Sequence, residues 1–235
     1  ANLKYIISFI IIAGAIQGFF LSFYIYRNIH NRNNSQLFLI FTLLFFSSNI
    51  ILNEFIQIFA VNEIDFIMTT GAFQLFLGPI LYFYVKSLTN SGFKHKIKDI
   101  IHFIPMFIYV FFLIVLHILI ELKSYLHIVN KIMWLFIILQ LIVYLIIIKK
   151  KIKIYDENIK DNYSNDTKIN LEWLNFVFVL LIITISFYYV IFAFFIHNIG
   201  NIIINKILSL ILSILIYVIG YKGLRQKSVS ISDFE

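Results

Sequence analysis

The chain has 235 residues, of which 61% are hydrophobic and 13% are charged, and its mean hydropathy is +0.91. This composition excludes an ordinary water-soluble domain, in which about a quarter of the residues are charged. The net charge of +7 comes from lysines and arginines that flank apolar stretches, so the expected partner is an anionic lipid surface and not a nucleic acid.

Seven apolar segments are long enough to cross a bilayer, which takes about 20 residues of helix. In chain order they cover residues about 5–26, 36–58, 65–85, 100–120, 129–148, 171–195 and 202–221. Residues 1–225 are therefore predicted to form an all-α, polytopic membrane domain, a bundle of seven transmembrane helices, with a cytoplasmic tail at 226–235. Leu3 to Tyr26 contains no small-residue cleavage site, so it is interpreted as a span and not as a signal peptide.

Two features modify this series of spans. Gly78-Pro79 lies inside the third span and predicts a relaxed or kinked helix, because proline cannot donate to the helical ladder. A hinge that moves on ligand binding is the alternative. The polar stretch from Lys149 to Asn170 is expected to continue the fifth helix into the cytoplasm and to turn near residues 162–166.

Lysine and arginine alternate between the connections. Fifteen of the nineteen follow the first, third, fifth or seventh span, and the other four are Lys4, Lys123, Lys131 and Lys206. Cytoplasmic loops of membrane proteins retain positive charge. The pattern therefore predicts a multi-pass protein of a bacterial inner membrane, with the N-terminus outside and the C-terminus in the cytoplasm.

Polar residues near the outer end of the second span form the candidate binding site. Ionisable groups inside a membrane are costly, so Glu54 is its strongest member. Asn49 and Asn53 recur at helical spacing beside it, and Gln74 and Gln17 are expected to face it from the third and first spans. Together they predict an outward-facing polar pocket. The alternative is ordinary hydrogen bonding between helices, which membrane bundles commonly use.

Lys206, near the outer end of the seventh span, has three interpretations. Its ammonium pairs with Glu54, holds an anionic ligand, or extends along the helix to the membrane interface. The last of these is the favoured one.

No arrangement typical of an enzyme emerges from the sequence. The six histidines show no helical spacing with a carboxylate that would bind a metal ion. The absence of cysteine also excludes thiolate nucleophiles and cysteine-bound metals. No cofactor and no catalytic residue is expected.

Five stretches in this order resemble the N-terminal seven-helix membrane region of AraC-type transcriptional regulators of Bacteroidetes. They are GAIQGFFLS at 14–22, GPILYFYVKSLT at 78–89, KDIIHFIP at 98–105, INLEWL at 169–174 and GYKGLRQ at 220–226. In that family the last stretch leads through a short linker into a cytoplasmic helix-turn-helix domain. The resemblance implies that 226–235 is a tail or the start of that linker, and that DNA is contacted only through a domain absent from this chain.

The expected function is that of a membrane-embedded sensor. It would pass an outer-side or intramembrane signal (a small molecule, a lipid or a membrane protein) to an attached or associated DNA-binding domain. Its expected partners are the lipid bilayer, that ligand and a second copy in a homodimer. The rival expectation is a structural or accessory subunit bound stably to another membrane complex.

Overall fold

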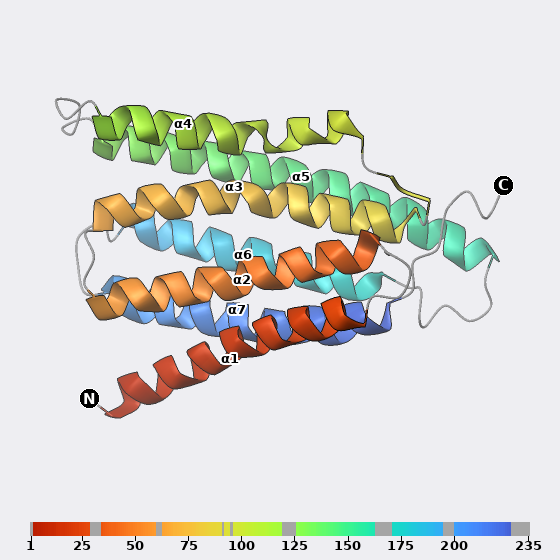
Figure 1. The fold of residues 1–235 in the computed structure, drawn as a ribbon, viewed down its shortest axis with the longest axis horizontal. Coiled ribbons are helices and arrows are strands. Elements are labelled where there is room, and N and C mark those ends of the chain that lie inside the picture. The colour runs from red at the N-terminus through yellow and green to blue at the C-terminus, as the bar shows by residue number, and fades with distance from the viewer. Residues whose placement is uncertain are drawn as a thin grey trace.

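The computed structural model describes residues 2–28, 34–59, 63–90, 92–94, 96–118, 126–162, 171–194 and 200–226. Within these ranges the chain is all-helical and contains no strand, which confirms the predicted all-α class (Figure 1). The helices are α1 (Asn2–Arg27), α2 (Asn34–Phe59), α3 (Glu63–Leu88), the 3-10 helix η1 (Ile97–Phe103), α4 (Ile104–Ile118), α5 (Leu126–Asn162), α6 (Glu172–Phe194) and α7 (Gly200–Arg225).

Two helix boundaries show how local sequence sets the fold. The fourth span was expected to begin near residue 100, but this segment starts as the 3-10 helix η1 and becomes α-helical only at Ile104. Pro105 has no N–H to donate to Ile101, so an α-helical ladder cannot run through this position from upstream. α5 continues as one helix to Asn162, as the sequence predicted. The turn expected at 162–166 lies almost wholly outside the described residues.

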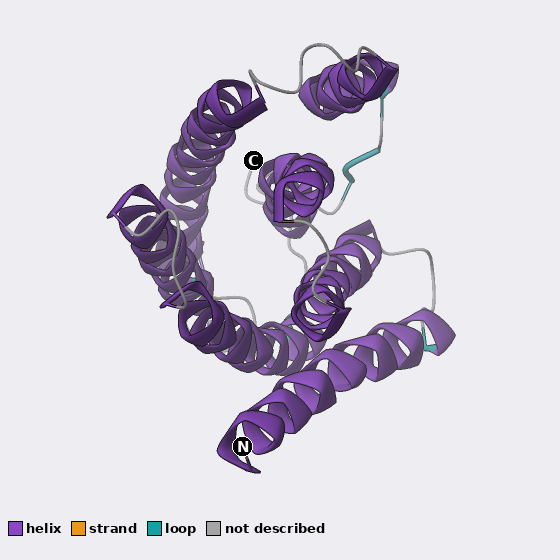
Figure 2. Cartoon of the chain, turned by 90° about the vertical axis from the view of Figure 1, so that its left-hand side faces the viewer, coloured by secondary structure: helices purple, strands orange, loops and turns teal. Residues whose placement is uncertain are grey.

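The helices form a bundle organised around α2. α2 packs against α1, α3 and α7, α1 also packs against α7, and α3 packs against α5. α6 contacts α7 and α5, whereas α4 contacts α3 and η1 at the edge of the bundle (Figure 2). A single apolar cluster runs through these contacts, and the large fully buried side chains include Tyr84, Phe46 and Leu43.

Close approach of α1 to its neighbours depends on a glycine pair four residues apart. A Cβ added at Gly14 would lie 2.5 Å from the Cβ of Ser213 on α7, and one at Gly18 would lie 2.0 Å from Ser47 Oγ on α2. Small residues at this spacing let helix backbones approach closely in apolar surroundings. Gly14 and Gly18 therefore seat α1 against both α2 and α7.

The seam between α3 and α5 is built around Pro79. Pro79 cannot donate to the carbonyl of Leu75 one turn earlier, which leaves that oxygen without its helical partner. Gln140 of α5 donates its side-chain Nε2 to this oxygen at 3.4 Å. Neighbouring helices commonly satisfy backbone groups that a proline frees in apolar surroundings. Pro79 thus frees an acceptor on α3 that a side chain of α5 satisfies.

The helices alternate in direction, so α1, α3, α5 and α7 all end at the end of the bundle where the described chain finishes (Figure 1). We call this end the basic end. Its described basic residues are Arg27, Lys86, Lys94, Lys96, Lys98, Lys149, Lys150, Lys151, Lys153, Lys222 and Arg225. The helix directions bring together in space cations that are scattered along the chain.

Three described segments are long and apolar enough to cross a membrane: Tyr5–Arg27, Asn34–Phe55 and Lys206–Arg225. Large apolar side chains on α1 are exposed, and Phe9 and Phe20 retain 74% and 70% of their accessible surface. An exposed apolar face of this extent is unfavourable in water and suits contact with lipid. Both observations indicate a membrane protein.

Candidate functional site

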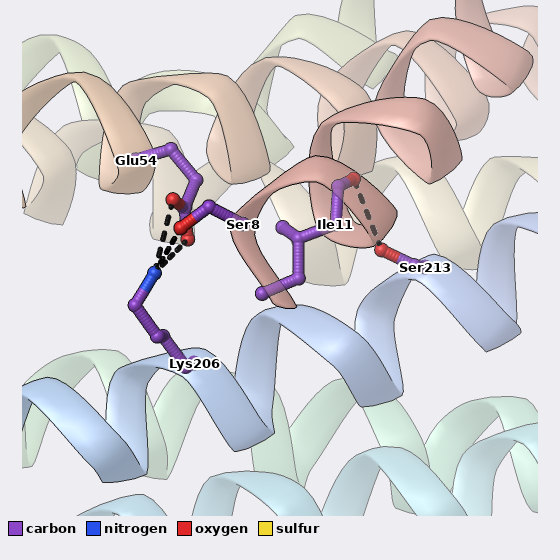
Figure 3. A network of polar contacts seen from close by, with 5 residues as sticks. All are labelled: Ser8, Ile11, Glu54, Lys206 and Ser213. Carbon is purple, nitrogen blue, oxygen red and sulfur yellow. Dashed lines mark hydrogen bonds and ion pairs between the residues drawn. The ribbon is translucent and has the colours of Figure 1, made fainter. Parts of the chain in front are cut away.

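A buried ion pair joins α2 to α7 at the end of the bundle opposite the basic end (Figure 3). The ammonium of Lys206 lies 3.3 Å from Glu54 Oε2 and 3.5 Å from Oε1. It also donates to the hydroxyl of Ser8 on α1. Glu54 is 2% exposed and Lys206 is 7% exposed, so both charges are withdrawn from the surroundings of the bundle. Three helices therefore meet at one polar contact, which we call the ion-pair site (Ser8, Glu54 and Lys206).

The positions of the three residues along their helices explain why they meet. Ser8 and Lys206 each lie six residues after the first residue of α1 and α7, and Glu54 lies five residues before the last residue of α2. A helix rises about 1.5 Å per residue, so each of the three residues lies roughly 7.5–9 Å from the nearby end of its helix. Because α1 and α7 run in the same direction and α2 runs opposite, the three side chains reach the same level.

The favoured interpretation of Lys206, extension to the membrane interface, is wrong. Its side chain points into the bundle and pairs with Glu54, which was the first of the three interpretations. A lysine stem extends outward when its charge has no partner within reach. Here a carboxylate and a hydroxyl lie inside the bundle, so they replace the water or headgroups that the ammonium would otherwise seek.

Burial makes this pair sensitive to any change in charge. Removing two ions from water costs several kcal/mol each, and their mutual attraction offsets that cost only while both are present. Neutralising Glu54, or drawing it toward another cation, would leave the Lys206 ammonium buried without its counter-ion. The arrangement therefore links the charge state of Glu54 to the packing of α1, α2 and α7.

A second polar contact lies next to the ion-pair site on α2. Gln74 of α3 donates Nε2 to Asn49 Oδ1 at 3.1 Å, and Asn49 donates to the backbone oxygen of Phe45 at 2.8 Å. Asn49 is buried, and Gln74 and Asn53 are half-buried. The structure thus brings Asn49 and Gln74 together as a hydrogen bond between helices, while Asn53 adjoins Glu54 in the chain.

Gln17 does not join these residues. The buried face of α1 is formed by Ile11, Ala15 and Gly18 at helical spacing, and the side chain of Gln17 is exposed. It lines a shallow depression on the surface of α1 together with residues such as Tyr24 and Arg27. The rotation of α1 about its own axis cannot be read from hydropathy, and this rotation turns Gln17 away from Glu54.

Two serines that the sequence interpretation passed over complete the contact between α1 and α7. Ser8 binds the Lys206 ammonium, and Ser213 reaches the carbonyl oxygen of Ile11 at 3.4 Å (Figure 3). The single proton of the Ser213 hydroxyl is shared between that oxygen and the carbonyl oxygen of Ser209 at 2.9 Å. Ser8 is the one hydroxyl between Ile6 and Ile16 in a strongly apolar stretch. This isolated polar position was the sequence signal that could have identified Ser8 as a contact residue.

Among the described residues, no group of three His, Asp or Glu side chains is placed to hold a metal ion. No protein-family model, no curated protein and no solved structure matches the chain. The resemblance to AraC-type regulators therefore stays a prediction carried by the five sequence stretches.

Proposed function

We propose that this chain is a sensor module whose seven helices cross the bacterial inner membrane, with the basic end in the cytoplasm. In this proposal a signal from the outer side changes the packing of the bundle, and α7 passes the change inward. The ion-pair site is the observation that carries the proposal, because it ties the first, second and last helices together at the end opposite the basic end. The orientation follows from the alternation of lysine and arginine.

The mechanism needs two packings of the bundle that differ in their affinity for the signal. Each tenfold difference in affinity shifts the balance between them by about 1.4 kcal/mol. A ligand that binds Glu54 or Lys206 would compete with the ion pair and so favour a packing in which α7 is released from α1 and α2. Because the pair is buried, breaking it has a large energetic effect.

The inner end of α7 is linked to α6, which gives a route for the output. Trp173 in the first turn of α6 donates Nε1 to Gln226 Oε1, just after the end of α7, at 2.9 Å. A displacement of α7 would therefore also move the start of α6. By resemblance, we place an attached or associated helix-turn-helix domain after Gln226, so that these two helix ends would set its position.

The rival function is that of an accessory subunit bound stably to another membrane complex. The edge helix α4 favours it, since Phe107 and Phe111 are exposed on its surface and a partner helix could cover them. Purification in mild detergent followed by mass measurement separates the two functions. A stoichiometric partner of different sequence would support the accessory role, and the chain alone or as a homodimer would support the sensor.

The proposed orientation can be tested by labelling, because these 235 residues contain no cysteine. A cysteine at Glu157, on the exposed part of α5 beyond the span, is expected to react with a membrane-impermeant maleimide only after the inner membrane is opened. A cysteine at Lys123 is expected to react in intact spheroplasts. Labelling of the Glu157→Cys variant in intact spheroplasts would overturn the orientation and with it the sensor proposal.

The coupling from the ion-pair site to the basic end can be tested by measuring distances between spin labels. Labels at Lys222 on α7 and Glu157 on α5 are expected to change their distance distribution by about 2 Å or more when Glu54→Gln is introduced, the scale of helix shifts at interfaces. Gln74→Leu is the matched control, because it removes a hydrogen bond between α2 and α3 and leaves α7 untouched.

The same distances are also measured in a Glu54→Leu/Lys206→Met variant. This variant lacks the ion pair but leaves no unpaired buried charge, so a change in its distances does not reflect a folding defect. Unchanged distributions in both variants would refute the coupling. A change that appears equally with Gln74→Leu would also refute it, since the effect would then be general loosening of the bundle.

A further inference from the structure

A cluster of charged and aromatic side chains lies at the basic end, away from the ion-pair site. It consists of Tyr82 and Lys86 on α3, Asp99 and His102 on η1, and Lys151 on α5, and we call it the interfacial cluster. Three separate elements supply these residues, which lie far apart along the chain. The fold therefore assembles a polar site here that the ion-pair site does not use.

Lys86 is held firmly within the interfacial cluster. Its ammonium lies 3.3 Å from Asp99 Oδ1 and 4.4 Å from the centre of the Phe93 ring. The side chains of Lys86 and Asp99 retain 25% and 16% of their accessible surface, so the pair is partly open to the surroundings. His102 Nδ1 and the Tyr144 hydroxyl lie 2.7 Å apart, which fixes η1, and with it Asp99, against α5.

Lys151 brings a second positive charge to the same place. It is half-buried, and its ammonium lies 6.0 Å from the centre of the Tyr82 ring, whose other neighbours include Lys86 at 5.7 Å. Burial, and then repulsion from Lys86, lower the pKa of Lys151 from that of a free lysine side chain. The interfacial cluster therefore holds two ammonium groups and one carboxylate, and one further negative charge would balance it.

The segment beside the cluster is suited to a lipid interface. Ile97 is 88% exposed, and Ile100 and Ile101 are exposed as well. Ile97 lies between the exposed basic residues Lys96 and Lys98. A short helix that exposes both isoleucine and lysine is stable where acyl chains meet headgroups. These side chains suit η1 to the depth at which lipid phosphates are found.

We infer that the interfacial cluster binds the phosphate group of an anionic phospholipid such as phosphatidylglycerol. The ammonium groups of Lys86 and Lys151 would face the phosphate oxygens, and the acyl chains would lie along the exposed isoleucines of η1. Basic sites between helices at the cytoplasmic side of membrane proteins recognise anionic headgroups in this way. The choice of leaflet rests on the proposed orientation, whereas the site itself does not.

The test uses the purified full chain in detergent, titrated with phosphatidylglycerol and separately with phosphatidylcholine, and bound lipids are counted by native mass spectrometry. Lys151→Gln is expected to weaken phosphatidylglycerol binding about fivefold, the effect of one lysine near an anionic surface. Lys150→Gln is the matched control, because it removes the same charge one residue away at an exposed position, and it should stay within about twofold of the wild type.

Lys151→Arg keeps the charge and is expected to restore binding, which separates charge from folding. Equal losses in the Lys150 and Lys151 variants, or equal binding of the two lipids, would overturn the site. If millimolar inorganic phosphate displaces the bound lipid, the site would be assigned to a soluble phosphate, and the proposal of a lipid ligand would be refuted. Selective loss in Lys151→Gln together with periplasmic labelling at Glu157 would retain the lipid site and refute the proposed orientation and, with it, the sensor function.

Discussion

Replacing Glu54 by leucine while Lys206 remains is expected to lower the free energy of unfolding by about 3–5 kcal/mol. The Lys206 ammonium would keep its buried position and its contact with Ser8 but would lose the carboxylate 3.3 Å away. Lys206→Met should also be destabilising, since Glu54 would then be the uncompensated charge. Unfolding of the purified protein in mixed detergent micelles, followed by circular dichroism, measures both effects.

The double variant Glu54→Leu/Lys206→Met distinguishes a broken pair from a lost contact. Apolar residues of similar volume can replace a buried ion pair at little or no cost, so the double variant should unfold within about 1 kcal/mol of the wild type. The resulting coupling energy of a double-mutant cycle is therefore large. Ser8→Ala, which removes one hydroxyl bound to the ammonium, should cost about 1.5–3 kcal/mol, less than the loss of either charge. Additive losses in the double variant would mean that the two charges do not interact.

The sequence was sufficient to identify the members of this pair but not to join them. Glu54 and Lys206 stand out because each is an ionisable residue in a long apolar helix. Whether they meet depends on which helices are neighbours in the bundle, and hydropathy carries no information about which helix packs beside which. The structure packs α1, α2 and α7 against one another, and that arrangement makes the contact.

Two further differences between the sequence predictions and the structure have local physical causes. Helix class and length follow from runs of apolar residues, but rotation about the helix axis does not, and Gln17 was therefore assigned to the wrong face of α1. The start of the fourth helix was misjudged because the apolar run continues through η1, whereas the ladder is interrupted at Pro105. A hydropathy pattern records which stretches suit an apolar environment, and backbone hydrogen bonding has to be read from individual residues.

Gly78→Ala is expected to lower the free energy of unfolding by about 1–3 kcal/mol, although alanine is intrinsically the better helix former by about 1 kcal/mol. A Cβ at this position would lie 2.6 Å from Tyr144 Cδ2 and 3.3 Å from Tyr144 Cβ. A clash that includes the stem of a side chain cannot be relieved by rotating its end. α3 and α5 would have to separate, which would also strain the bond from Gln140 to Leu75 O. Gly92→Ala is the control, since among the described residues its Cβ would meet Asn90 Oδ1 alone, at 3.5 Å.

Pro79 offers a second reason for glycine at position 78, because the ring of a proline crowds the Cβ of a preceding helical residue. Comparing Gly78→Ala/Pro79→Ala with Pro79→Ala alone separates the two causes. If contact with Tyr144 dominates, adding the alanine at 78 still destabilises the protein when the proline is gone. Equal stability of these two variants, measured by the same unfolding method, would assign the requirement to the proline and would show that the α3–α5 seam tolerates a side chain.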